Sequence, residues 1–209
     1  MGIIDRMNPG SRHPPGATTS PRLRLPACGW DLATLAMLGA VLLFALATFD
    51  QHGLSNDEPV QHTYGRLLLD FYRSGFTDRH AFDYLNLHLY GGLFDLIAAI
   101  LEPVSPWPVW DLRHLLSALF GVAGCGFAAL TARHLGGPRA GLLAVVLLGI
   151  TGAWTGAMFT HTKDVPFGAA MIAATWFSTR LVAELPLPRA GTLVGLGLSL
   201  GAAMGLRVG

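Results

Sequence analysis

Long apolar stretches alternate with short polar ones along most of this chain. Residues 32–49, 115–132, 140–159, 165–182 and 193–206 are nearly free of charge. A helix needs about 20 mainly apolar residues to cross a bilayer, so these stretches predict about five transmembrane helices. The composition agrees, because 13% of the residues are charged and 52% are hydrophobic, whereas a soluble domain is usually about 25% charged. The pattern therefore predicts an all-α polytopic membrane protein.

A further apolar stretch, residues 85–104, is less uniform than the others. His88, Asp95 and Glu102 recur in it every seven residues. On a helix these side chains form one polar stripe. Such a stripe suits a helix that lies in the membrane interface better than a helix that crosses the membrane.

The distribution of positive charge gives the orientation of the spans. Lys and Arg favour cytoplasmic loops, and two short hairpins carry Arg, at residues 133–139 and 180–189. Both hairpins fall on the same side as the basic N-terminus only if residues 85–104 do not cross. We therefore expect a cytoplasmic N-terminus, with residues 50–109 on the opposite side as a first outer loop that contains the interfacial helices.

The first 29 residues differ in composition from the rest. They are rich in Pro, Gly, Ser and Thr and carry Arg6, Arg12, Arg22 and Arg24. Such a segment buries too little apolar surface to offset its chain entropy, which predicts a disordered, basic cytoplasmic tail. A cleaved signal peptide is the alternative, although the apolar run that follows has full membrane length. Residues 30–209 are expected to form the transmembrane module.

Two adjacent acidic residues, Asp57 and Glu58, stand in the outer loop where a helical pattern begins. Ser55 and Glu58 fit a capping box, and Asp57 in the first turn would be stabilised by the helix dipole. On spacing alone, these structural roles stand slightly ahead of catalysis.

A second acidic position lies on the same side of the membrane. Asp164 stands with His161 and Lys163 where a span meets the outer surface. Ionisable groups at membrane depth are costly and tend to be functional, although Asp164 could also cap the next helix. One carboxylate here could take a proton from an incoming nucleophile. Asp57 and Asp164 together leave a divalent metal open as a cofactor, but the sequence does not require one.

Arg207, at the outer end of the last span, is a cation suited to a phosphate group. Its structural alternative is snorkelling at a span end. With Arg113 and Lys163 it forms a set of outward positive charges that run against the usual distribution and need a separate reason.

The order of these features resembles a known family. The acidic pair in SNDEPVQHTYGRLLLDFYRSG is followed by RHLLSALFGVAG, ARHLGGPRAGLLAVVLLGITG, THTKDVPFGAA and GLGLSLGAAMGLRVG. Over residues 30–209 this order is similar to the GT-C superfamily of membrane glycosyltransferases. More narrowly, it resembles the bacterial branch related to protein O-mannosyltransferases and to the lipid A aminoarabinose transferase. The resemblance implies a polyprenyl-phosphate-linked sugar donor, a lipid or protein acceptor, and a site on the non-cytoplasmic face of the bacterial inner membrane.

The resemblance also implies roles for particular residues. Asp57 matches the first-loop acidic residue proposed as base or acceptor-binding group, with Glu58 beside it, and Asp164 matches the second outer-loop acidic residue. Arg207 stands where relatives often have a cation near the donor phosphate. The chain departs from the family at Tyr84-Leu85-Asn86-Leu87-His88, where many relatives carry a basic residue followed by prolines. Relatives also continue for several more spans, which implies that this chain is an N-terminal part.

These observations predict glycosyl transfer to an acceptor hydroxyl. The predicted catalytic residues are Asp57, Glu58 and Asp164, and the predicted substrate-binding residues are Arg207, His161 and Lys163. An ion- or proton-coupled transporter is the alternative, with Asp57, His161 and Asp164 as a relay; it predicts acidic residues in mid-span. A membrane scaffold, in which every outer charge is a cap or a snorkel, is a third. The net charge of +1 gives no reason to expect a nucleic-acid partner.

Overall fold

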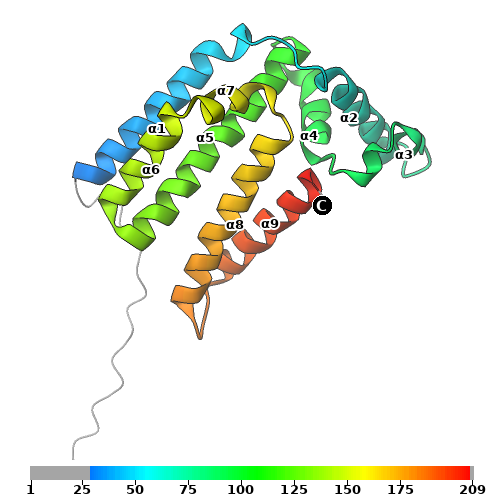
Figure 1. Cartoon of the computed structure of the whole chain (residues 1–209). Coiled ribbons are helices and arrows are strands. Elements are labelled where there is room, and N and C mark those ends of the chain that lie inside the picture. Colours follow the sequence, from blue (N-terminus) through cyan, green and yellow to red (C-terminus); the bar gives the residue numbers. More distant parts are fainter. Residues whose placement is uncertain (1–28, 208–209) are drawn as a thin grey trace, which may run out of the picture.

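The computed structural model describes residues 29–207, and every regular element in this range is a helix. The chain is an all-α polytopic membrane protein, as its apolar pattern predicts (Figure 1). The expected N-terminal tail lies outside the described residues except for Gly29, which begins the first helix. The elements in chain order are α1 (Gly29–Thr48), η1 (Phe49–Gln51), α2 (Glu58–Arg73), α3 (His80–Asp83), η2 (Leu87–Leu89), α4 (Leu93–Leu101), η3 (Glu102–Val104), α5 (Val109–Gly136), α6 (Pro138–Ile150), α7 (Gly152–Thr160), α8 (Asp164–Glu184) and α9 (Ala190–Leu206), where η denotes a 3-10 helix.

Three of the helices in the described residues are long and apolar enough to cross a membrane: α1 with η1, α5 and α8. The bent pair α6 and α7 makes a fourth if it is one span. α9 has 17 residues, or about 26 Å at the rise of an α-helix, slightly less than the ~30 Å hydrocarbon core. The five apolar stretches thus appear as these helices. Two of them are not uninterrupted full-length spans, because the α6–α7 stretch is bent and α9 is short.

The expectation of one continuous helix over residues 140–159 is wrong. α6 and α7 meet at Thr151 and their axes differ by 67°. The backbone of Thr151 is extended; its N–H donates to the carbonyl of Leu147, and its own carbonyl accepts the N–H of Trp154. Thr151 therefore ends one helix and begins the next, although the residues on both sides are apolar.

The segment 85–104 contains no helix long enough to cross a membrane, because its longest helix, α4, has only nine residues. It is also not one helix. η2, α4 and η3 are separate elements, so their polar residues do not form a single stripe. Asp95 is buried, whereas His88 is exposed.

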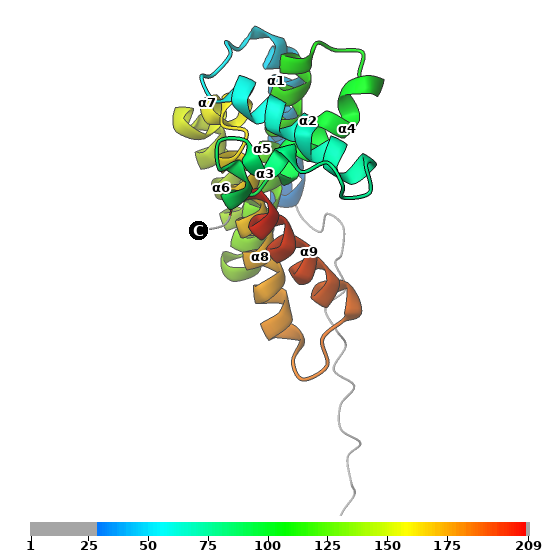
Figure 2. The ribbon, with the colours of Figure 1, turned by 90° about the vertical axis from the view of Figure 1, so that its right-hand side faces the viewer.

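The long helices run side by side, and the outer-loop helices α2, α3 and α4 gather at one end of them (Figure 1). The α5–α6 and α8–α9 turns lie away from that end in both views (Figure 2). The end of α7, the start of α8 and the end of α9 lie at the same end as α2. This topology brings residues about 100 positions apart into one region.

Two apolar clusters hold the helices together, and the second of them includes the outer loop. The first joins α1, α5, α7 and α8, and the second joins α4, α8 and α9. In the second, Phe94 of α4 packs with Ala203 and Leu206 of α9. The last turn of α9 is therefore seated under the outer loop. The buried members of the two clusters are Val41, Ala45, Ala118, Met158, Phe159 and Val165, and Phe94, Ala170, Ala203 and Leu206.

Candidate functional site

The two acidic residues at the start of α2 lie in different surroundings. Glu58 is fully buried; it accepts the backbone N–H of Ser55 at 2.7 Å and lies 3.0 Å from Nε2 of His114. Asp57 is exposed, and its carboxylate has no hydrogen-bond partner among residues 29–207. One residue step turns a helix by about 100°, so the two side chains point in different directions. Asp57 can meet a bound molecule, whereas Glu58 supports the fold.

The bond from Ser55 to Glu58 is one half of the capping box that the sequence predicts. Behind Glu58, the ring of His52 stacks on that of Phe159, with centroids 3.8 Å apart, and meets His114 edge-on. Burial, and secondly the nearby His114, lower the pKa of His52. This group of rings lies just beyond the outer end of α1 and fixes the start of the outer loop.

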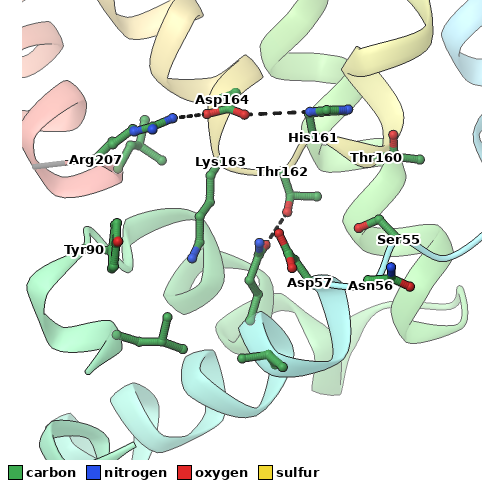
Figure 3. Close-up of a pocket in the computed structure, with 14 residues that line it drawn as sticks. Ser55, Asn56, Asp57, Tyr90, Thr160, His161, Thr162, Lys163, Asp164 and Arg207 are labelled. Carbon is green, nitrogen blue, oxygen red and sulfur yellow. Dashed lines mark hydrogen bonds and ion pairs between the residues drawn. The ribbon is translucent and has the colours of Figure 1, made fainter. Parts of the chain in front are cut away.

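The turn between α7 and α8 carries three of the predicted residues. Asp164 is the first residue of α8 and forms an ion pair with Arg207. Nδ1 of His161 lies 3.7 Å from Oδ2 of Asp164, and the Lys163 ammonium lies 5.6 Å from the centre of the Tyr90 ring. Figure 3 shows these side chains around one hollow, with Lys163 reaching toward the space between Tyr90 and Asp57. The N-cap of α8 is Lys163, and Asp164 stands in the first turn, one residue after the capping position that the sequence suggested for it.

Arg207 is fixed by the packing of the last turn of α9. Its backbone is extended and its N–H donates to the carbonyl of Ala203 at 3.0 Å. The preceding residues press on the outer loop: a Cβ on Gly91 would collide with the carbonyl group of Gly205. Glycine at position 91 therefore allows the two backbones to meet, and this contact holds Arg207 beside the loop.

These elements enclose a pocket of about 600 Å³. Its wall is built from the start of α2, the segment around η2, the α7–α8 turn and the end of α9. Five of the six predicted site residues line it, whereas Glu58 lies outside the lining. The five are Asp57, His161, Lys163, Asp164 and Arg207. The cations Lys163 and Arg207 thus line the same pocket as the carboxylates of Asp57 and Asp164.

A buried polar network supports the pocket from behind. Oε1 of Gln61 accepts the hydroxyl of Thr162 at 2.5 Å and Nη2 of Arg113 at 3.3 Å. The same guanidinium nitrogen donates to Asp95 at 2.7 Å, and Arg113 and Asp95 are each 1% exposed. The network ties α2, α4 and α5 to the turn that carries Lys163. It also shows that Arg113 pairs with a carboxylate inside the protein.

Sequence reasoning did not single out Gln61, Thr162 or Tyr90. Gln61 and Thr162 are neutral and 101 residues apart, so no local motif joins them. Asp95 was noted only as part of a polar stripe. Its role in the network could have been suspected from one signal, a carboxylate within an apolar segment, because a buried carboxylate requires a partner.

A metal centre is not assembled by the described residues, because in the range 29–207 no three His, Cys, Asp or Glu side chains cluster as ligands. Asp57 and Asp164 line the same pocket, but the carboxylate of Asp164 is engaged by Arg207. Oxygen ligands from both residues would require that ion pair to open.

Comparison with known proteins gives one match. The family model described as dolichyl-phosphate-mannose-protein mannosyltransferase matches residues 94–208, which is more than half of the 209 residues. The matched range includes Asp164 and Arg207 but not Asp57. No curated protein and no solved structure matches the chain.

Proposed function

Since the chain belongs to the dolichyl-phosphate-mannose-protein mannosyltransferase family, it is a membrane glycosyltransferase, and we propose that it moves a sugar from a polyprenyl-phosphate-linked donor to an acceptor hydroxyl at the non-cytoplasmic membrane face. The observation that carries this proposal is the pocket in which Asp57 faces the cations Lys163 and Arg207. A lipid-linked sugar phosphate presents an anion beside its reacting carbon. In the pocket, the cations suit the anionic phosphate, and the carboxylate suits the acceptor hydroxyl that attacks the carbon.

In the proposed reaction, the acceptor oxygen attacks the anomeric carbon of the sugar. The bond from that carbon to the phosphate oxygen breaks, and its electron pair stays on the polyprenyl phosphate. The acceptor proton passes to the carboxylate of Asp57, which acts as general base. Direct displacement of this kind inverts the anomeric centre.

The cations serve the leaving group. Negative charge grows on the phosphate as the bond breaks, and fixed cations that meet this charge lower the barrier. Lys163 and Arg207 suit this role because both are held at the pocket by contacts that are open to solvent, with Tyr90 and Asp164. Asp164 acts as a positioning residue in this proposal, since it orients Arg207 and lies close to His161.

The same geometry supports an orientation in the membrane. The pocket lies at the end of the helices that carries α2, away from the Arg-bearing α5–α6 and α8–α9 turns (Figure 1). Loops with Lys and Arg favour the cytoplasm. The proposal therefore places the N-terminus in the cytoplasm and the pocket outside, in the bacterial inner membrane that the family resemblance implies.

The arrangement of charges favours an enzyme over a transporter. A proton or ion relay requires acidic side chains within the membrane. In the long helices of the described residues, the acidic side chains stand near the ends. They are Asp31 and Asp50 at the two ends of α1 with η1, Asp111 at the start of α5, and Asp164 and Glu184 at the two ends of α8.

The proposal is tested with the intact protein in sealed membrane vesicles. A short-chain polyprenyl-phosphate mannose, labelled in the sugar, is added outside right-side-out and inside-out vesicles together with a hydroxyl acceptor. We expect transfer with release of polyprenyl phosphate in right-side-out vesicles only. A nucleotide-linked mannose serves as the control donor and should give no transfer. Turnover of the nucleotide sugar, or no turnover of the lipid phosphate sugar, contradicts the proposal.

A further inference from the structure

Gln61 combines burial with a place on the pocket wall. The residue is 6% exposed and lines the pocket. It lies one helical turn after Asp57, whose carbonyl accepts the Gln61 backbone N–H at 2.9 Å. A change at Gln61 therefore acts close to the carboxylate that is proposed to be the base.

The orientation of the Gln61 amide is fixed by its neighbours. A guanidinium has donors only, so the amide atom that faces Nη2 of Arg113 at 3.3 Å is the oxygen. The hydroxyl of Thr162 donates to the same oxygen. Arg113 is held in turn by Asp95 at 2.7 Å. These bonds prevent the amide from exchanging its oxygen and nitrogen.

The amide nitrogen is left as the other end of this fixed group. Among residues 29–207, Nε2 of Gln61 has no hydrogen-bond partner. The atom is also not fully buried by the protein. Buried polar side chains nearly always have partners. A donor that is oriented by two buried contacts and left open at a pocket is preorganised for a bound molecule.

We propose that Gln61 binds the sugar of the donor, with Nε2 donating a hydrogen bond to a sugar hydroxyl oxygen. This inference rests on the proposed function and adds a recognition residue to it. The charged side chains Lys163 and Arg207 suit the phosphate, whereas a neutral amide suits a neutral hydroxyl. Few precisely placed polar groups of this kind fix the orientation of a ligand in its pocket. Binding at Gln61 places the sugar beside Asp57.

Two substitutions separate the roles of the amide. Gln61→Glu keeps oxygens that can accept from Arg113 and Thr162, but removes the N–H donor. Gln61→Met removes both functions without adding a charge. Thr63→Val is the matched control on the same helix, because Thr63 is exposed and its hydroxyl bonds only to the carbonyl of Pro59 in the described structure.

The experiment uses the intact protein in vesicles and a series of short-chain polyprenyl-phosphate mannose donors, each lacking one sugar hydroxyl. With unsubstituted protein, one deoxy donor should lose about tenfold in kcat/KM, the size expected for one hydrogen bond. Gln61→Glu and Gln61→Met should lose a similar factor on the complete donor and no further factor on that deoxy donor. Any effect of the added carboxylate on the phosphate is the same for every donor and cancels in this comparison. Thr63→Val should behave as the unsubstituted protein.

The inference is overturned if no deoxy donor is impaired with unsubstituted protein, whatever the variants do. It is also overturned if the variants lose the same factor on every donor, because the amide then contacts no sugar hydroxyl. Absence of turnover with all donors is a different result, which removes the proposed function and the Gln61 assignment together.

Discussion

The two neighbouring acidic residues at the start of α2 should differ strongly in how much stability is lost when each is replaced by alanine. Glu58→Ala removes an acceptor from the backbone N–H of Ser55 and the partner of the buried His114 ring, at 2.7 and 3.0 Å. A buried polar group that loses its partner costs about 1–3 kcal/mol. With Ser55 half-buried, we expect a loss of about 2–4 kcal/mol in total. For a protein of this size, that lowers the unfolding temperature by about 5–15 °C.

Asp57→Ala changes an exposed side chain without a partner among residues 29–207. Such surface changes stay within about 0.5 kcal/mol, or about 2 °C. Thermal unfolding of the two variants in the same detergent, followed by fluorescence and by size exclusion, measures the difference. Equal destabilisation by the two substitutions, or a larger effect at Asp57, refutes the assignment of Glu58 to the fold and of Asp57 to the pocket.

Three further predictions concern the neighbours of the pocket. Gly91→Ala should push the end of α9 away from the outer loop, because its Cβ would meet the α9 backbone. Activity and the unfolding temperature should both fall. If neither changes, the close contact between Gly91 and α9 is contradicted. Lys163→Gln and Arg207→Gln should each raise KM for the lipid phosphate donor and lower kcat, while the unfolding temperature changes little. If neither KM nor kcat changes, these cations do not act on the phosphate. Burial, and secondly His114, lower the pKa of His52 from its usual 6.5, so its neutral form is favoured in the folded protein and stability should fall as pH drops below about 6.5; His52→Phe should flatten that part of the pH profile of unfolding, and an identical profile in both proteins contradicts this role.

The sequence was sufficient to predict the helical class and the absence of a full-length apolar helix over residues 85–104. Both depend on length and on the cost of placing charge in lipid, which the sequence displays directly. The break at Thr151 was missed because apolar residues flank it on both sides. Threonine and glycine are tolerated within spans, so neither residue marks a break without knowledge of the packing.

The sequence predicted that the acidic and basic candidates lie on one side of the membrane, and the structure gives five of them a common pocket. The sequence could not separate Asp57 from Glu58, because both fit the start of a helix. Their difference arises from His114, a residue 56 positions after Glu58. Gln61 was missed for a related reason: its partners Arg113 and Thr162 lie 52 and 101 residues away. Contacts of that range are set by the assembled helices.

Asp57 remains the residue on which the mechanism depends, and it can be tested with an almost isosteric change. Asp57→Asn keeps the size of the side chain and removes its ability to take a proton. The rate of mannose transfer from polyprenyl-phosphate mannose by this variant, measured on protein that inserts and unfolds as the unsubstituted protein does, is the most direct measurement. We predict a fall of at least about 100-fold, the lower range for loss of a general base. Transfer at a near-normal rate would contradict the account.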